Sequence, residues 1–255
     1  MKNDGKRNEY LFIYKLNNKR VSELDYLLRD MIESIFDDIN PSDIIKCFKL
    51  FEYEKPDICI VVKNQKKYIS IKKGIRNSVH GEKIDKFIRY LKKINVNEEV
   101  INCILKYHYA DGTIDGSGRI RQSLQDYKKE HYDEIKFIND SINKRDIVES
   151  IINRFLIQGT QTHTNKVDIL VYGTPNDFFY ILKEDIYNFM LSKLNYQSSA
   201  VHFSCLTFQP MSRVLDYDES KQERRQAIQI KWYNLEDNII EIMNQKLLNN
   251  LGDTN

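Results

Sequence analysis

The residues from Lys55 to Gly74, KPDICIVVKNQKKYISIKKG, place a carboxylate, a hydroxyl and a lysine at spacings that suit phosphodiester chemistry. Two strands joined by Asn64-Gln65 would put Asp57 directly opposite Lys72, and an even-length loop keeps both on one face with Ser70. The other face of this predicted hairpin is apolar and is expected to enter the core; it carries Ile58, Ile60, Ile69 and Ile71.

Hydrolysis of a phosphodiester needs a nucleophilic water and positive charge near the phosphate and the leaving oxygen. Carboxylates hold Mg²⁺, which supplies charge and activates water, and a nearby lysine orients the water or stabilises the transition state. Mg²⁺ is usually held by one or two carboxylates together with waters and substrate oxygens. One carboxylate alone therefore predicts weak metal binding unless another acid joins it.

Pro56-Asp57 followed by Ser70-Ile71-Lys72 resembles the signature of the PD-(D/E)XK nuclease superfamily, which includes many restriction endonucleases and repair nucleases. The resemblance covers about residues 22–94, where the superfamily core of a helix, a meander of strands and a second helix can be laid out. It implies that Asp57 is a Mg²⁺ ligand and that Lys72 is the catalytic lysine. Ser70 departs from the signature, which has Asp or Glu at that position.

Two acids elsewhere are candidates for the missing ligand. Glu82 is expected at the start of the helix after the lysine strand, and superfamily members relocate their acid in that way. The alternative for Glu82 is an i,i+4 pair with Lys86 in water. Glu33 is the second candidate, because the superfamily often adds an acid from its first helix. Other acids of that helix are equally eligible, namely Glu23, Asp30 and Asp37.

Apolar periodicity predicts the elements that would position these residues. A helical stripe runs through residues 22–39, and strands are expected at about 44–51, 57–63 and 67–73. After a turn at 74–78, Ser78 is expected to cap a helix that ends near Ile94. The first part of the chain therefore alternates helix, strands and helix.

The remaining chain is expected to be mainly helical from Val96 to Leu156, interrupted by DGTIDGSGR at 111–119, which is interpreted as a turn or short hairpin. Beyond Gly159, strands are predicted at 167–172, 178–182, 201–208 and 226–232, and helices at 183–194 and 235–248. The order predicts a mixed α/β fold in one domain, 1–255, with a helical insertion at 96–157. Under the resemblance, it is a restriction-endonuclease-like central sheet flanked by helices.

Basic residues gather around the first hairpin and the helix after it, as a phosphate-binding face requires; a solvated lysine-rich surface is the alternative. A second hairpin, with Gln229-Ile230-Lys231 on one strand, repeats the lysine spacing without a Pro-Asp partner. His80 is interpreted as a structural histidine or as a phosphate contact from a helix N-terminus. The candidate DNA contacts are Lys73, Arg76, His80, Gln209, Arg213, Arg224, Arg225 and Lys231.

The composition narrows the classes of function. The 41% apolar and 30% charged residues are typical of a soluble globular protein, and the net charge of +2 does not by itself indicate a nucleic-acid partner. No P-loop, dinucleotide fingerprint, nucleophile elbow or H-E-x-x-H motif occurs. Four scattered cysteines and the absence of a signal-type or membrane-spanning apolar run predict a cytoplasmic protein without a membrane partner.

Three hypotheses follow. The first is a Mg²⁺-dependent DNA endonuclease of restriction type, acting on double-stranded DNA as a homodimer. The second is a DNA-binding protein on the same fold, in which Ser70 marks a lost acid and Lys72 contacts phosphate. The third is a protein-interaction module with an accidental motif. Metal dependence separates the first from the second, and salt-sensitive DNA binding separates both from the third.

Overall fold

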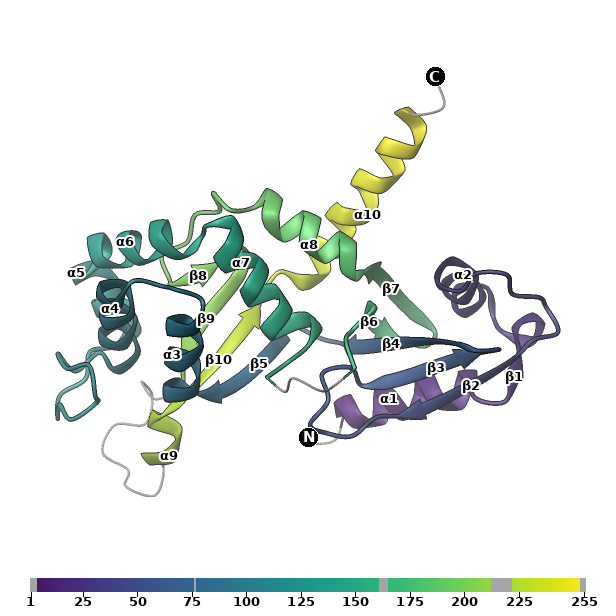
Figure 1. Ribbon diagram of the computed structural model, residues 1–255, viewed down its shortest axis with the longest axis horizontal. Helices are drawn as coiled ribbons and strands as arrows, with labels where there is room; N and C mark the ends of the chain where they lie inside the picture. The colour runs from purple at the N-terminus through teal and green to yellow at the C-terminus, as the bar shows by residue number, and fades with distance from the viewer. Residues whose placement is uncertain (1–3, 76, 161–164, 212–221, 253–255) are drawn as a thin grey trace. The chain divides into compact units, whose positions relative to one another are not determined.

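The computed structural model describes residues 4–75, 77–160, 165–211 and 222–252, and the chain folds into two compact units (Figure 1). The first unit comprises Met1–Asn77, Leu156–Asn188 and Asn234–Asn255, and the second comprises Ser78–Phe155 and Phe189–Tyr233. Each unit has its own β-sheet. The mixed α/β class is therefore confirmed, whereas the expectation of a single domain stays a prediction.

The first unit contains a six-stranded sheet with the order β1-β2-β3-β4-β6-β7. The pairing of β4 with β6 is parallel and the other pairings are antiparallel. Its strands are β1 Lys19–Arg20, β2 Ile44–Lys49, β3 Ile58–Val62, β4 Gln65–Lys72, β6 Ile169–Thr174 and β7 Asp177–Leu182. Its helices are α1 Asp4–Leu16, the 3₁₀-helix Val21–Glu23, α2 Tyr26–Ile35 and α10 Leu235–Gly252, while α8 Lys183–Ser192 continues into the second unit.

Helices α1 and α2 cover one face of this sheet. Phe12 of α1 packs edge-on against Phe178 of β7, with ring centroids 5.5 Å apart. Helix α2 begins where the Asp25 side chain accepts a hydrogen bond from the Leu28 amide. The four isoleucines predicted to line the apolar face of the first hairpin are all buried in this core: Ile58, Ile60, Ile69 and Ile71. Helix α1 was not predicted, because its buried stripe is narrow and consists of Asn8, Phe12 and Leu16.

The register of the first hairpin differs by two residues from the sequence-based prediction. Val62 pairs with Gln65 and Ile58 pairs with Ile69, so the turn is Lys63-Asn64. Continuing this register places Asp57 opposite Ser70 instead of Lys72. A shift of two residues keeps every side chain on its predicted face. The prediction that Asp57, Ser70 and Lys72 share one face therefore agrees with the structure. The predicted pairing of Asp57 with Lys72 was wrong.

The second unit has a four-stranded sheet with the order β5-β10-β9-β8. Its strands are β5 Asn77–Lys83, β8 His202–Phe203, β9 Leu206–Pro210 and β10 Ala227–Trp232. Its helical elements are α3 Ile84–Lys93, α4 Glu98–Tyr109, α5 Leu124–Glu130, α6 Tyr132–Ile142, α7 Arg145–Ile152, α9 Gln222–Arg225 and a π-helical turn Asn153–Ile157. The predicted helical block at 96–157 thus consists of α4 to α7 and the π-helical turn.

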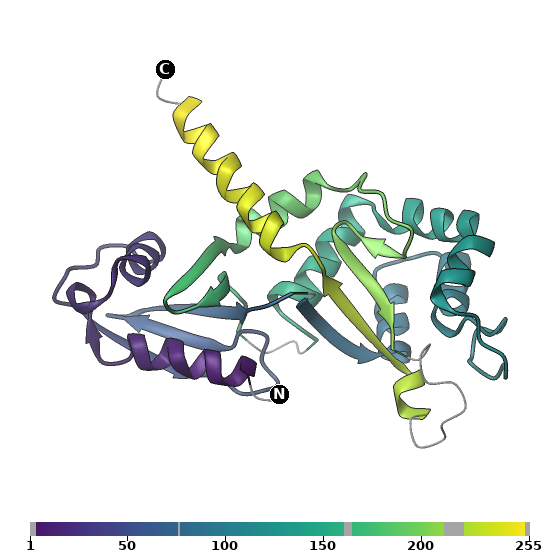
Figure 2. The same ribbon diagram turned by 180° about the vertical axis from the view of Figure 1, so that it is seen from behind.

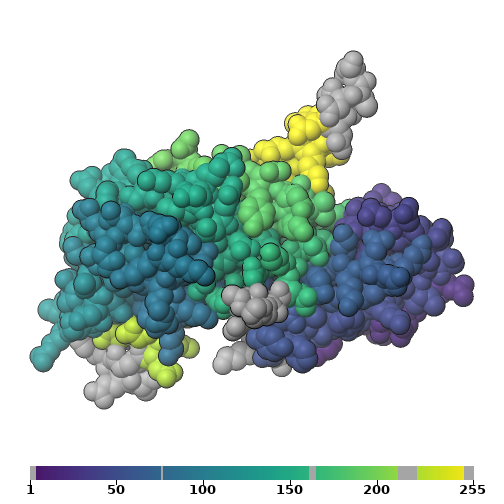
Figure 3. All heavy atoms as spheres, viewed as in Figure 1, coloured from purple at the N-terminus to yellow at the C-terminus, as the bar shows by residue number. Residues whose placement is uncertain are grey.

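Helices α3 and α4 of the second unit pack on one face of its sheet. Phe208 of β9 contacts Phe87 of α3 and Tyr107 of α4, with ring centroids 5.8 and 6.1 Å apart. In Figure 2 the strands of this sheet lie in front of α3, and Figure 3, viewed from the opposite side, shows the helical residues of this unit in blue to teal. No helix in the part of the chain that the structure describes is long and apolar enough to cross a membrane.

Two local predictions in the second unit were wrong. Residues 77–83 form strand β5, so the helix expected from Ser78 begins at Ile84, whose amide donates to the Gln226 carbonyl oxygen. The pairing partner of β5 is β10, about 150 residues later, which local periodicity cannot reveal. The strand expected at 201–208 is a short hairpin, because Ser204 turns the chain with a φ of 52°.

Candidate active site

The candidate site lies on the face of the first sheet that α1 and α2 leave uncovered. Asp57 precedes β3, and its backbone amide donates to the Ile69 carbonyl oxygen at 2.8 Å, which extends the ladder. Its Oδ2 accepts hydrogen bonds from the Ile71 amide at 2.6 Å and from Ser70 Oγ at 3.2 Å. The Asp57 carboxylate is therefore held in a fixed position by the neighbouring strand β4.

Lys72 completes this arrangement. Its Nζ lies 3.6 Å from Asp57 Oδ2 and donates to the Ile71 carbonyl oxygen at 3.1 Å. The side chains of Lys72 and Asp57 are 19% and 20% exposed, so both are partly accessible and largely shielded from water. The structure thus brings together the carboxylate and the lysine that the sequence singled out.

Lys55 is a second cation at this site that the sequence analysis did not single out. Partial burial, together with the positive charge of Lys72, lowers the pKa of Lys55 to about 7, and the negative charge of Asp57 opposes the shift. The residue immediately before Pro56-Asp57 is therefore close enough to both candidate catalytic side chains to interact with them electrostatically. In the sequence, the position of Lys55 directly before Pro56-Asp57 was the only indication that it belongs to this site.

Tyr172 is another neighbour that local reasoning missed. It pairs with Lys72 across the parallel β4–β6 ladder, so both side chains lie on the same face. Its Oη lies 2.9 Å from Glu236 Oε2 and 3.0 Å from the Gly74 carbonyl oxygen. Burial, and then the Glu236 carboxylate, raise the pKa of Tyr172 to about 12. The identity of the residue beside Lys72 depends on pairing with a strand 100 residues later in the chain.

The donor atoms of this site fit a hard divalent cation. Asp57 Oδ1 accepts no hydrogen bond from the described residues, and Ser70 Oγ and the Ile71 carbonyl provide further oxygens nearby. Oxygen donors are those that Mg²⁺ prefers. Among the residues described, no group of three or more His, Cys, Asp or Glu side chains is placed to hold a metal ion. The site therefore suits Mg²⁺ at low affinity, with waters and substrate oxygens completing its coordination.

Glu82 lies in the second unit, on β5, and not at a helix N-terminus as predicted. Arg154 Nε and Nη2 donate to Glu82 Oε1 and Oε2 at 3.0 and 2.6 Å. His80 Nε2 lies 3.3 Å from Oε1, and the Glu82 side chain is only 3% exposed. The proposed pair with Lys86 in water is therefore replaced by a buried pair with Arg154.

This buried cluster is electrostatically balanced. Burial opposes ionisation of Glu82, but hydrogen bonds from His80 and Arg154 outweigh it and hold its pKa below the ordinary value. The Arg154 guanidinium also stacks 4.2 Å from the Tyr90 ring centre, and His80 stacks on Phe155 at 4.8 Å. These contacts favour a structural role for Glu82 and for His80, whose predicted position at a helix N-terminus was wrong. The metal role of Glu82 stays a prediction.

Glu33 is exposed on α2. The buried residues of that helix, including Met31 and Ile32, pack in the same core as Ile58 and Ile69. Helix α2 therefore covers the sheet face opposite to the one that carries Asp57, and the structure does not bring Glu33 to the site. Its catalytic role stays a prediction without a supporting contact.

The second hairpin forms as β9 and β10, with Gln229 opposite Gln209 and Lys231 opposite Thr207. These four side chains are half-buried and lie on the face away from Phe208, the residue that packs against α3 and α4. The two glutamines and Lys231 thus form a polar surface on a rigid pair of strands.

The other candidate DNA contacts are placed differently. Arg225 donates to the Gly116 carbonyl oxygen and lies 3.6 Å from Asp111 Oδ2, whereas Arg224 is exposed on α9. Lys73 Nζ lies 2.8 Å from Asp4 Oδ1. Arg76 and Arg213 lie outside the described residues. Their roles, like those of the other predicted DNA contacts, stay predictions.

Comparison with known proteins supports the fold. No family model matches the sequence, and no curated protein does. The crystal structure of restriction endonuclease MspI in complex with its cognate DNA aligns with a TM-score of 0.55 at 11% identity, over 90% of this chain and 92% of that chain. Identity this low carries information on the fold and none on individual residues. The chain therefore has a restriction-endonuclease-like fold, as the hairpin motif had led us to expect.

Proposed function

We propose that this protein is a Mg²⁺-dependent endonuclease that hydrolyses phosphodiester bonds in double-stranded DNA, as a PD-(D/E)XK enzyme with Ser70 at the second acidic position. The observation that carries the proposal is the contact between Asp57 and Lys72, with Nζ 3.6 Å from Oδ2 and both side chains partly exposed. The fold likeness to a DNA-bound restriction endonuclease supports the same conclusion.

The roles that we propose for these residues are based on their positions. Asp57 would hold Mg²⁺ through Oδ1, with the Ile71 carbonyl oxygen and Ser70 Oγ as further donors. The ion, when bound, supplies Lewis acidity to the phosphate and lowers the pKa of a bound water. Lys72 keeps its ammonium group beside the carboxylate, where it orients the attacking water or stabilises charge on the phosphate oxygens. Ser70 donates to Asp57 Oδ2 and keeps that carboxylate oriented.

The surface of the β9–β10 hairpin is proposed to contact the DNA. Glutamine side chains make bidentate hydrogen bonds with adenine in the major groove, and lysine binds guanine or phosphate. The Gln209–Gln229 pair and Lys231 offer these groups from one rigid face. Exposed Arg224 and the cations Lys73, Arg76 and Arg213 would add contacts to the backbone phosphates.

Two accompanying expectations complete the proposal. One site of this kind cuts one strand, so we propose that the protein acts as a homodimer that places a site on each strand. The four cysteines are free thiols, which suits the reducing cytoplasm. Sedimentation of the protein with and without DNA tests the first expectation.

A DNA-binding protein without catalysis is the second candidate. The observation that favours it is the occupancy of Asp57 Oδ2 by Ser70 and the Ile71 amide, with no second carboxylate among the described contacts of Asp57. In that case Lys72 would bind phosphate and no metal would be needed. The fold and the β9–β10 surface would serve both functions.

The deciding experiment is cleavage of mixed, unmethylated plasmid and phage DNA with Mg²⁺, with Mn²⁺ and with EDTA. Discrete fragments that require the metal are expected. Intact DNA that is still shifted on a gel at low salt would support the second candidate. Neither cleavage nor salt-sensitive binding would exclude both and leave a protein-interaction module.

A further inference from the structure

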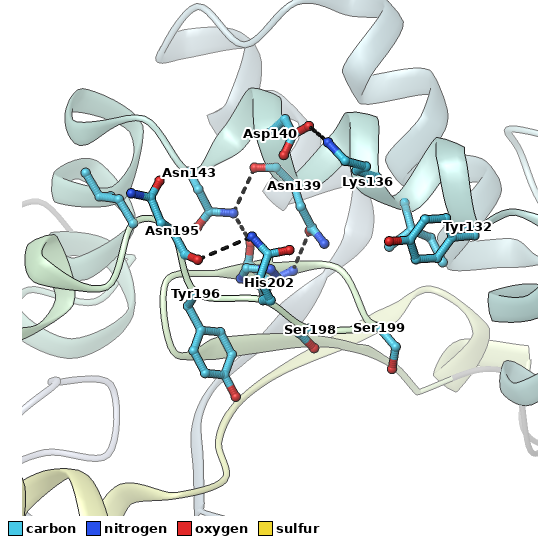
Figure 4. A pocket seen from close by; sticks show the side chains of 13 residues that line it. Tyr132, Lys136, Asn139, Asp140, Asn143, Asn195, Tyr196, Ser198, Ser199 and His202 are labelled. Carbon is cyan, nitrogen blue, oxygen red and sulfur yellow. Dashed lines mark hydrogen bonds and ion pairs between the residues drawn. The ribbon is translucent and has the colours of Figure 1, made fainter.

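A polar cavity of about 160 Å³ lies in the second unit between α6, the segment 194–199 and β8 (Figure 4). One wall is a single face of α6, which includes Tyr132, Lys136 and Asn139, and the other wall includes Tyr196 and Gln197. Pockets for drug-sized ligands usually measure about 300–1,000 Å³. This cavity is therefore suited to one small ring system and not to a whole nucleotide.

His202 lines the cavity and is 2% exposed. Its Nδ1 lies 2.9 Å from the Ser204 carbonyl oxygen, an acceptor, so Nδ1 carries the proton and Nε2 holds a lone pair. Nε2 makes no hydrogen bond with any described residue. The ring edge turned away from Ser204 thus offers the cavity an acceptor that a donor N–H can satisfy.

The other charged and polar side chains that line the cavity interact with groups of the protein. Lys136 and Asp140 form an ion pair with each other. Asn139 is occupied by the Ala200 carbonyl oxygen and the His202 amide, which fixes α6 to β8. An anion would find no unpaired cation among these walls, so the cavity suits a neutral ligand with hydrogen-bonding edges.

Aromatic rings stand at the opening. Tyr196 is 41% exposed, and its ring lies perpendicular to that of His202 with centroids 5.5 Å apart; Tyr132 is 62% exposed. Aromatic side chains stack on nucleobases of any sequence, because every base has a π-face. A flat ligand with an apolar face and a polar edge would therefore match the rings and His202 together.

The cavity is linked to the surface proposed to contact DNA. His202 pairs with Thr207, and Thr207 pairs with Lys231, so these three residues form one cross-strand row on the same sheet face. Adjacent strands lie about 4.8 Å apart, so His202 and Lys231 are separated by about 10 Å along this row. A base that leaves a duplex held at Lys231 would have the cavity within reach.

We propose that this cavity holds a single unpaired nucleobase, with a donor N–H of the base on His202 Nε2 and its ring against Tyr196. The base would come from bound DNA, and to that extent the inference rests on the proposed function. The affinity of the cavity for a base does not depend on cleavage.

The first test is ligand-detected NMR titration of the full chain with adenosine, cytidine, guanosine and thymidine in turn, and with ribose as the probe without a base. At least one nucleoside is expected to bind and ribose is not. Tyr196→Ala should raise the dissociation constant of the nucleoside about tenfold, because the stacking contact is lost. Tyr26→Ala removes another exposed tyrosine, on α2, and should leave binding unchanged.

His202→Gln tests the role of His202 as the acceptor, and circular dichroism checks that this variant folds. Gln197→Ala changes the cavity wall that also carries Tyr196; because Gln197 is exposed, this substitution does not disturb the core. Absence of nucleoside binding, equal binding of ribose, or undiminished binding by Tyr196→Ala would overturn the inference. DNA cleavage without nucleoside binding would overturn this inference alone. Nucleoside binding without cleavage would support it and remove the nuclease proposal.

Discussion

The two hairpins of this protein share a local pattern and differ in what faces their lysine. In β3–β4, Ser70-Ile71-Lys72 runs beside Asp57, and the lysine ammonium lies 3.6 Å from a carboxylate. In β9–β10, Gln229-Ile230-Lys231 runs beside a strand that offers Thr207 and Gln209. A lysine two residues after a polar one is therefore a weak signal. The residue on the partner strand decides whether chemistry or recognition is available.

The surroundings of the two hairpins strengthen this difference. The first hairpin lies inside its sheet, between β2 and β6, so its candidate catalytic residues are held on both sides by backbone pairing. The outward face of the second is made of half-buried amide and lysine side chains. Catalysis benefits from groups held in place before the substrate binds, whereas base contacts need side chains that reach out from a rigid support.

The largest effect is expected for Lys72→Ala. Loss of a group that stabilises the transition state should lower the cleavage rate by a factor of about 10²–10³ or more, while DNA binding changes little. Single-turnover cleavage with saturating protein measures the rate. Lys66→Ala is the matched control, because Lys66 is an exposed lysine on the same face of the same strand.

The same assay on Lys231→Ala tests the comparison directly. Undiminished cleavage by Lys72→Ala together with abolished cleavage by Lys231→Ala would reverse the roles of the two hairpins. Asp57→Asn should resemble Lys72→Ala but respond to added Mn²⁺ or Mg²⁺, because it removes the charge of the proposed metal ligand.

Arg154→Met tests whether Glu82 has a structural role or the metal-binding role predicted from the sequence. Removing one member of a buried ion pair costs about 3–5 kcal/mol, since the other charge is left unpaired. Urea unfolding should show this loss, and the double variant Arg154→Met, Glu82→Gln should recover part of it. A Glu82→Gln protein that folds stably but needs far more Mg²⁺ for cleavage would instead place Glu82 at the metal.

Lys231→Ala is expected to act on binding. If Lys231 contacts a phosphate, its loss should reduce the slope of log affinity against log salt by about 1 and weaken binding to all sequences equally. Gln209→Ala should leave that slope unchanged and relax preference at particular base pairs. Fluorescence anisotropy over a salt series with two unrelated duplexes distinguishes the two outcomes. If both variants show the same salt slope and the same sequence preference, the β9–β10 surface does not recognise base pairs.

The smallest effect concerns His202, at the end of the Lys231 row. Burial lowers its pKa below the ordinary 6.5, against the opposing Ser204 carbonyl. In the unfolded chain His202 then binds a proton more tightly than in the folded protein. The contribution of neutral His202 to the free energy of unfolding is therefore fully present above pH 6.5 and is lost as the pH falls through the folded pKa. Thermal unfolding at about pH 7.5 and about pH 5.5 should show a smaller decrease for His202→Gln than for the unaltered protein. Equal decreases would mean that His202 does not control acid sensitivity.

Much of the first hairpin was predictable because its evidence is local. Alternating isoleucines between Ile58 and Ile71 predict two strands with one apolar face, and parity then assigns Asp57, Ser70 and Lys72 to the other. The same parity made the candidate site insensitive to the two-residue error in register. The short turn, where Lys63 adopts a φ of 52°, was the part that side-chain pattern could not locate.

The second unit shows where such reasoning ends. Residues 77–83 carry a cap-like serine and lead into a helical stripe, so the local pattern favours a helix from Ser78. Pairing with β10 stabilises a strand there instead, and that strand buries Glu82 against Arg154. A carboxylate that looked free for a metal in the sequence is thus neutralised by a residue 72 positions away.

The sequence by itself determined which side chains share a strand face, because alternation depends only on the geometry of the extended chain. It thereby determined that a carboxylate, a serine and a lysine of the first hairpin face the same way. Tertiary structure alone decided that Tyr172 lies beside Lys72, that Arg154 holds Glu82 and that His202 ends a row with Lys231. These contacts join residues distant in the chain, and their stability comes from burial and pairing that no short window of sequence contains.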